Sequence, residues 1–108
     1  MKPRLLNEGG VTQISLKNGK RLAKRLGPPV RVEAHRNSRT GEWYTVTAYY
    51  ESGDQHTFTG FSWGYGGEGP HGFAEWCEAN DIPLTFDEIA KLDNNTDGCV
   101  WAWPNEAA

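Results

Sequence analysis

The stretch WYTVTAYYESGDQHTFTGF, residues 43–61, decides the fold of this chain. Residues 43–50 are rich in β-branched and aromatic side chains, which favour a strand. The following Ser-Gly-Asp predicts a turn, after which residues 55–61 return as a second strand. Further upstream, apolar and polar residues alternate over residues 30–34 and predict a third strand. We therefore expect an antiparallel three-stranded meander at the centre of the fold.

The N-terminal part of the chain predicts one strand and one helix. Residues 11–16 alternate loosely between apolar and polar side chains, which indicates a short first strand. Asn18 then suits the N-cap of a helix that runs from residue 20 to residue 26. Gly27 ends this helix, and the two prolines that follow prevent its continuation.

The C-terminal part predicts two helices and a last strand. Residues 73–80 place apolar side chains at helical spacing, with Pro70 suited to the first turn. Thr85 and Glu88 have the spacing of a capping box, which predicts a second helix. Residues 99–103 are apolar and end at a proline, so we expect a final strand there.

Together these elements predict an α+β fold, with an antiparallel β-sheet of about four or five strands and two to three short helices packed on one face. The length of 108 residues fits one domain over residues 1–108. Within it, we expect residues 1–10 to be a frayed lead-in and residues 104–108 a polar tail.

Composition indicates a cytoplasmic protein. The chain has neither an apolar run long enough for a membrane span nor the apolar core of a signal peptide. Its two cysteines, Cys77 and Cys99, are expected to be reduced and buried. We found no paired spacing of metal ligands and expect no cofactor and no metal. The oligomeric state is open.

The net charge of −3 hides a strong polarity along the chain. Residues 1–40 carry ten of the eleven basic side chains and a net charge of +8, whereas residues 41–108 carry −11. Such asymmetry can indicate a charged partner, or two halves that face each other. If the partner is a nucleic acid, the candidate contacts are Lys17, Lys20, Arg21, Lys24, Arg25, Arg31, Arg36 and Arg39.

A glycine-rich segment over residues 61–72 joins the meander to the next helix. Its spacing matches G-x-G-x-x-G after a strand and before a helix, which is the local context of a dinucleotide fingerprint. We set that interpretation aside because we expect antiparallel strands, the chain is short, and Glu68 would repel a phosphate. Two interpretations stay open, a tight structural turn or a recognition loop. In a recognition loop the binding residues would be Trp63, Tyr65, Glu68 and His71.

The same segment, residues 60–73, resembles a run shared by small uncharacterised bacterial and phage proteins. These carry a WGYGG-x-GP segment that leads into a helix. The resemblance implies a bacterial or phage origin and no particular activity.

No catalytic motif occurs in the sequence, and we do not expect an enzyme. The leading hypothesis is a small non-catalytic binding protein, encoded by a phage or mobile element, that engages a host protein or complex in the bacterial cytoplasm, for example to inhibit a defence system. The alternatives are a nucleic-acid-binding protein that uses the basic face within residues 17–39, and a small-molecule or nucleotide binder at the glycine-rich loop.

Overall fold

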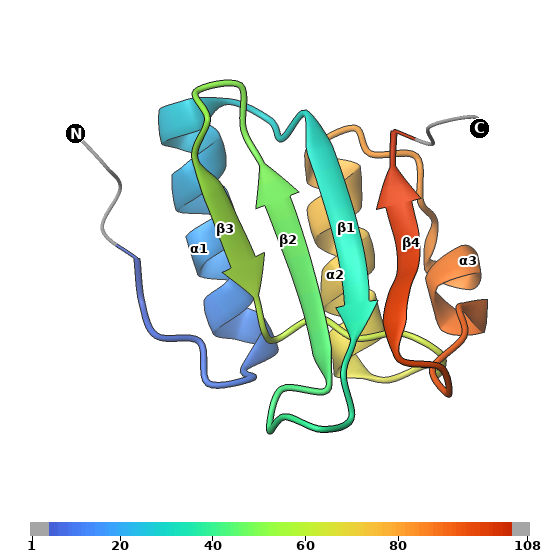
Figure 1. The fold of residues 1–108 in the computed structure, drawn as a ribbon. Helices are drawn as coiled ribbons and strands as arrows, with labels where there is room; N and C mark the ends of the chain where they lie inside the picture. Colours follow the sequence, from blue (N-terminus) through green and yellow to red (C-terminus); the bar gives the residue numbers. More distant parts are fainter. Residues whose placement is uncertain (1–4, 105–108) are drawn as a thin grey trace.

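The computed structural model describes residues 5–104, which form three helices and four strands (Figure 1). In chain order they are α1 (Thr12–Leu26), β1 (Arg31–Arg36), β2 (Tyr44–Tyr49), β3 (Gln55–Phe58), α2 (Glu68–Ala79), α3 (Phe86–Lys91) and β4 (Gly98–Trp103).

The four strands form one antiparallel sheet in the order β3-β2-β1-β4. The predicted meander is its centre, since β1 pairs with β2 in the register Val32 to Ala48, and β2 pairs with β3 in the register Val46 to Phe58. The last strand, β4, returns from the C-terminal part to pair with β1. Figure 1 shows α1 and α2 on the same face of the sheet. The predicted α+β class is therefore confirmed.

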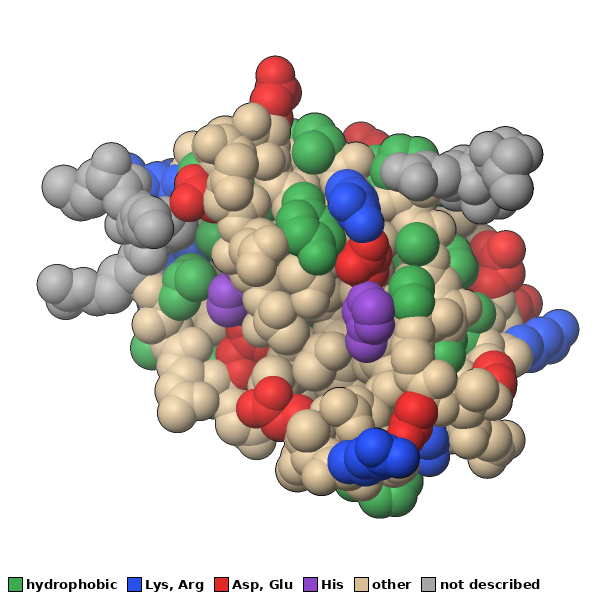
Figure 2. All heavy atoms as spheres, viewed as in Figure 1, with side chains coloured by type: hydrophobic (Ala, Val, Ile, Leu, Met, Phe, Trp, Pro, Cys, Tyr) green, Lys and Arg blue, Asp and Glu red, His purple; other side chains and the backbone are tan. Residues whose placement is uncertain are grey.

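The core lies between this sheet face and the helices. The strands contribute small and branched side chains, of which Val32, Ala34, Val46 and Ala48 are completely buried. The helices and the connection before α2 contribute large rings, and those of Phe61 and Phe73 stack at 5.8 Å between centroids. Such rings bury much area per residue, which suits a small domain. The opposite face of the sheet is open, and hydrophobic side chains are scattered among polar ones on it (Figure 2).

The predicted strand over residues 11–16 is wrong, because Val11 is the N-cap of α1 and residues 12–16 form its first turn. The buried residues of this region, Thr12, Ser15 and Leu16, follow helical spacing once the polar side chains are included. The hydroxyl of Thr12 donates to the carbonyl of Gly60 at 2.7 Å. An interpretation based on apolar residues alone could not detect a helix whose buried face is partly polar.

The prediction that Asn18 is an N-cap is also wrong, because Asn18 lies in the middle of α1 and is completely buried. Its side chain binds the backbone of Leu6, accepting from the N–H at 2.9 Å and donating to the carbonyl at 2.8 Å. A buried side-chain amide is tolerated when its hydrogen bonds are satisfied. Asn18 therefore holds the segment before α1 against the helix.

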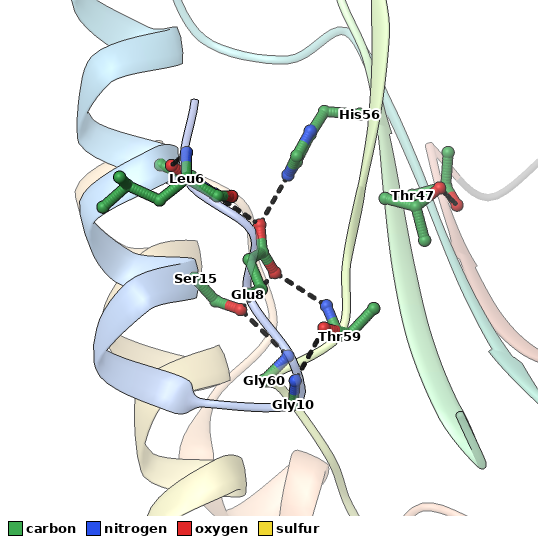
Figure 3. Close-up of polar contacts among 10 residues, drawn as sticks. Leu6, Glu8, Gly10, Ser15, Thr47, His56, Thr59 and Gly60 are labelled. Atoms are coloured by element: carbon green, nitrogen blue, oxygen red, sulfur yellow. Dashed lines mark hydrogen bonds and ion pairs between the residues drawn. The ribbon is translucent and has the colours of Figure 1, made fainter. Parts of the chain in front are cut away.

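This segment, residues 5–10, was expected to be frayed, but Glu8 fixes it to both α1 and β3 (Figure 3). The Glu8 carboxylate is buried and accepts hydrogen bonds from the Ser15 hydroxyl and from Asn18 Nδ2, the latter at 2.9 Å. From the sheet side, the N–H of Thr59 donates to it at 2.8 Å, and His56 Nε2 lies 2.6 Å from Oε2. Residues 1–4 and 105–108 lie outside the described part of the chain.

These contacts keep Glu8 ionised. Burial favours the neutral form of the carboxyl group, but the hydrogen bonds from His56, Asn18, Ser15 and Thr59 outweigh it, so the pKa lies below its ordinary value of 4.5. The Glu8 contribution to stability is therefore fully present above the unfolded pKa and disappears as the pH falls through the lower pKa of the folded protein.

We predict that Glu8→Gln lowers the free energy of unfolding at neutral pH by about 2 kcal/mol, because an amide nitrogen would face N–H donors and the charge-assisted bonds are lost. Urea denaturation measures this change, with Glu51→Gln in the exposed turn before β3 as the matched control. The difference between wild type and Glu8→Gln should shrink below pH 4.5. A difference that stays constant down to acid pH would contradict the role given to the Glu8 charge.

Candidate binding groove

The structure separates the four residues predicted for a recognition loop. Trp63 is completely buried, with its indole N–H donating to the carbonyl of Asp93 at 3.0 Å. The Tyr44 ring packs edge-on against it, at 4.9 Å between centroids. Trp63 is therefore part of the core and offers no surface to a ligand.

His71 is exposed on α2 but lies over the neighbouring helix. Its ring stacks on Phe86 of α3, with 4.0 Å between centroids and 11° between planes. A shallow depression beside this pair is lined by residues of α2 and by Phe86. His71 thus belongs to the surface that α2 and α3 share.

Tyr65 and Glu68 remain together, and both line a groove of about 740 Å³. Tyr65 is 47% exposed, and its hydroxyl lies 2.7 Å from Ser62 Oγ, which fixes the ring in place. Glu68 is exposed at the start of α2. A groove of this size lies within the range of natural ligand sites.

Three distant segments form this groove. The lead-in contributes Gly9 and Gly10, the connection from β3 to α2 contributes residues 59–62, and the loop from β1 to β2 contributes residues 41–43. Trp43 from that loop is 48% exposed and lines the groove together with Tyr65. Trp43 was predicted to lie in a strand and was not among the candidate binding residues. Its position directly after the turn at Gly41 is the one sequence signal that could have suggested an exposed ring.

The glycines of this region allow close packing. A side chain at Gly60 would overlap the backbone carbonyl of Val11, and a side chain at Gly69 would overlap the Ser62 hydroxyl. Gly60 therefore lets the start of α1 lie against the connection from β3 to α2. These glycines support the structural interpretation of the loop, while Tyr65 and Glu68 stay available on its outer side.

The charged residues that line the groove are all acidic. Its charged lining residues are Glu42 and Glu68, and none of the residues that line it is Lys, Arg or His. Within the described part of the chain, neither carboxylate forms an ion pair. Glu68 also lies in the first turn of α2, where the helix dipole favours a negative charge.

The eight basic residues proposed for nucleic-acid binding lie in three places. Arg31 is on the open face of the sheet, with its guanidinium 4.9 Å from the centre of the Tyr49 ring. Arg36 is only 11% exposed and pairs with Asp97 at 2.6 Å, while Arg39 is in the loop from β1 to β2. The remaining five share one exposed face of α1, namely Lys17, Lys20, Arg21, Lys24 and Arg25.

The two cysteines are free and lie apart. Cys77 is buried on α2, and burial raises the pKa of its thiol, so it stays protonated. Cys99 was also expected to be buried but is exposed on β4, opposite His35. Within residues 5–104, no group of three or more His, Cys, Asp or Glu could hold a metal ion. In the same range, no helix is long and apolar enough to cross a membrane.

Comparison of the chain with protein-family models, with curated proteins and with solved structures gave no match. Inferences about function therefore depend on the geometry described above.

We predict that Gly60→Ala lowers the free energy of unfolding by about 2 kcal/mol or more, because the backbone of Val11 cannot move away without shifting α1. Gly66→Ala is the matched control, since the nearest atom to its new side chain is Phe86 Cζ at 3.9 Å. It should change stability by about 0.5 kcal/mol at most. Equal losses for the two variants in urea denaturation would show that the close approach at Gly60 is unimportant.

Proposed function

We propose that this protein is a non-catalytic binding module that engages a partner protein through the groove between Trp43 and Tyr65. The observation that carries the proposal is that these two rings, each about half exposed, line one groove although they come from separate loops. Exposed aromatic side chains are enriched where proteins bind one another.

The residues that form the groove are held in place by other contacts, which favours a site that is already formed before binding. Tyr65 is oriented by Ser62, the lead-in wall is fixed by Glu8, and Trp43 packs against the guanidinium of Arg36 at 5.2 Å. A site whose side chains are already ordered loses less conformational entropy on binding. A small ligand in the same groove is the alternative within this proposal, and native mass spectrometry of the gently purified protein would detect it.

The cellular setting belongs to the proposal as well. The resemblance of residues 60–73 to small bacterial and phage proteins supports a partner that is a host protein or complex in the bacterial cytoplasm. The tertiary structure adds a reason for the glycine-rich sequence in that run, since Gly60 and Gly69 allow close packing beneath the groove.

A second candidate function is nucleic-acid binding through α1. Five cations lie on one exposed face of this helix, and α1 contains no acidic residue. Phosphate contacts of this kind supply affinity without sequence readout. The neighbouring helix α2 opposes it, because its exposed charged side chains are Glu68, Glu75 and Glu78.

To test the groove, peptides are selected from a random display library for binding to the wild-type protein. We predict that these peptides bind the variants Trp43→Ala and Tyr65→Ala about tenfold or more weakly than they bind wild type. His71→Ala is the matched control, because this exposed ring lies outside the groove. The affinity of this variant for the peptides should stay within about twofold of the wild-type affinity. Each half-exposed ring contributes little to the core, so all three thermal melts should stay close to wild type. If the selected peptides bind the two groove variants as well as wild type, the groove is not the binding site.

For the second function, we predict that a labelled random duplex binds with an affinity that falls about a hundredfold or more between roughly 50 and 200 mM salt. Fluorescence anisotropy measures this, and the double variant Lys20→Glu/Lys24→Glu should abolish binding. Arg39→Glu, in the loop from β1 to β2, is the control that should leave it unchanged. Absent or salt-independent binding would remove this candidate.

A further inference from the structure

The groove between Trp43 and Tyr65 has the wrong charge for an anionic ligand. An anion would meet the carboxylates of Glu42 and Glu68, since no lining residue is a cation and Arg36, which stacks on Trp43, is already paired with Asp97. The start of α2 offers a partial positive charge, but Glu68 already lies there. A cationic ligand would instead find two carboxylates available for ion pairing.

The aromatic walls of the groove add a second attraction for the same charge. Tryptophan and tyrosine rings attract a cation over their faces. Within residues 5–104 the protein makes this contact twice, with Arg31 over Tyr49 at 4.9 Å and Arg36 over Trp43 at 5.2 Å. In both cases the cation is a guanidinium, which stacks on an aromatic plane while its N–H groups bind carboxylates.

The remaining lining of the groove suits a peptide. Five of the lining residues are glycines, of which Gly9, Gly10 and Gly41 are exposed and leave this part of the lining free of bulky side chains. Peptide segments commonly gain affinity from backbone hydrogen bonds and specificity from a few side chains.

We propose that the groove binds an arginine side chain presented by an exposed segment of the partner protein. Its guanidinium group lies between the rings of Trp43 and Tyr65 and pairs with the carboxylates of Glu42 and Glu68. This inference rests on the proposed function, because it names the chemistry of the partner at the same groove.

The test uses the full chain and two probe peptides, each acetylated, amidated and made of glycine with one central residue. In the first peptide this residue is arginine, and in the second it is citrulline, which has the same shape without the charge. Backbone amide shifts in two-dimensional NMR spectra report where each peptide binds and how tightly. The variants are Glu42→Gln/Glu68→Gln and, as the matched control on the outer side of α2, Glu78→Gln.

We expect the arginine peptide to shift the amides of the groove, including those of Gly9, Gly41 and Gly69. Replacing arginine by citrulline, or introducing Glu42→Gln/Glu68→Gln, should weaken this binding about tenfold or more, while Glu78→Gln leaves it unchanged. Added salt should also weaken it, since part of the attraction is between exposed charges.

Three results would overturn the inference. The citrulline peptide could bind the groove as tightly as the arginine peptide, or the arginine peptide could shift only the carboxylate-bearing surface of α2 and α3. Library peptides could also bind the groove while the arginine peptide does not. In the first and third cases the proposed function stands and only the arginine chemistry is wrong. If neither the library nor the arginine peptide yields groove binding, both proposals fail together.

Discussion

The buried carboxylate of Glu8 joins the lead-in and α1 to β3, which lies much later in the sequence. It accepts hydrogen bonds from two residues of α1 and from the backbone at Thr59, just after β3, and it lies beside His56 within that strand. An ionised group can be buried only when such partners replace its hydration. Because Glu8 needs all of them, α1, β3 and the lead-in have one relative arrangement. That arrangement also places Gly9 and Gly10 as a wall of the groove.

The glycine-rich segment over residues 60–72, which includes the connection from β3 and the start of α2, divides its residues between two roles. Trp63 faces inward and fills the core, and Gly60 and Gly69 remove the side chains that would keep α1 and Ser62 away. Tyr65 and Glu68 face outward on the same short segment. The structural and the recognition interpretations of this loop are therefore compatible, because they concern different residues of it.

The charge polarity of the sequence appears in the fold as a difference in charge between α1 and α2. The exposed charged residues of α1 are all Lys or Arg, and the exposed Asp, Glu, Lys and Arg residues of α2 are all Glu. The ion pairs described above involve β1, β3, the lead-in and Asp97, and none of these four pairs joins α1 to α2. The basic side chains of α1 and the glutamates of α2 are exposed. The residues that line the groove include two glutamates and no Lys, Arg or His, which is the basis of our proposal of a cationic ligand.

The sequence by itself determined the features that depend on local patterns. The alternation in residues 30–34 and 43–50, and the capping box of Thr85 and Glu88, required only neighbours along the chain, and the structure contains both strands and the cap. Only the tertiary structure decided that residues 12–16 are helical, because their buried face is partly polar and its hydrogen bonds go to Glu8 and Gly60. It also decided that Trp43, and not Trp63, shares a surface with Tyr65. Whether a ring faces solvent depends on contacts with segments that are distant in sequence, and no local pattern predicts those contacts.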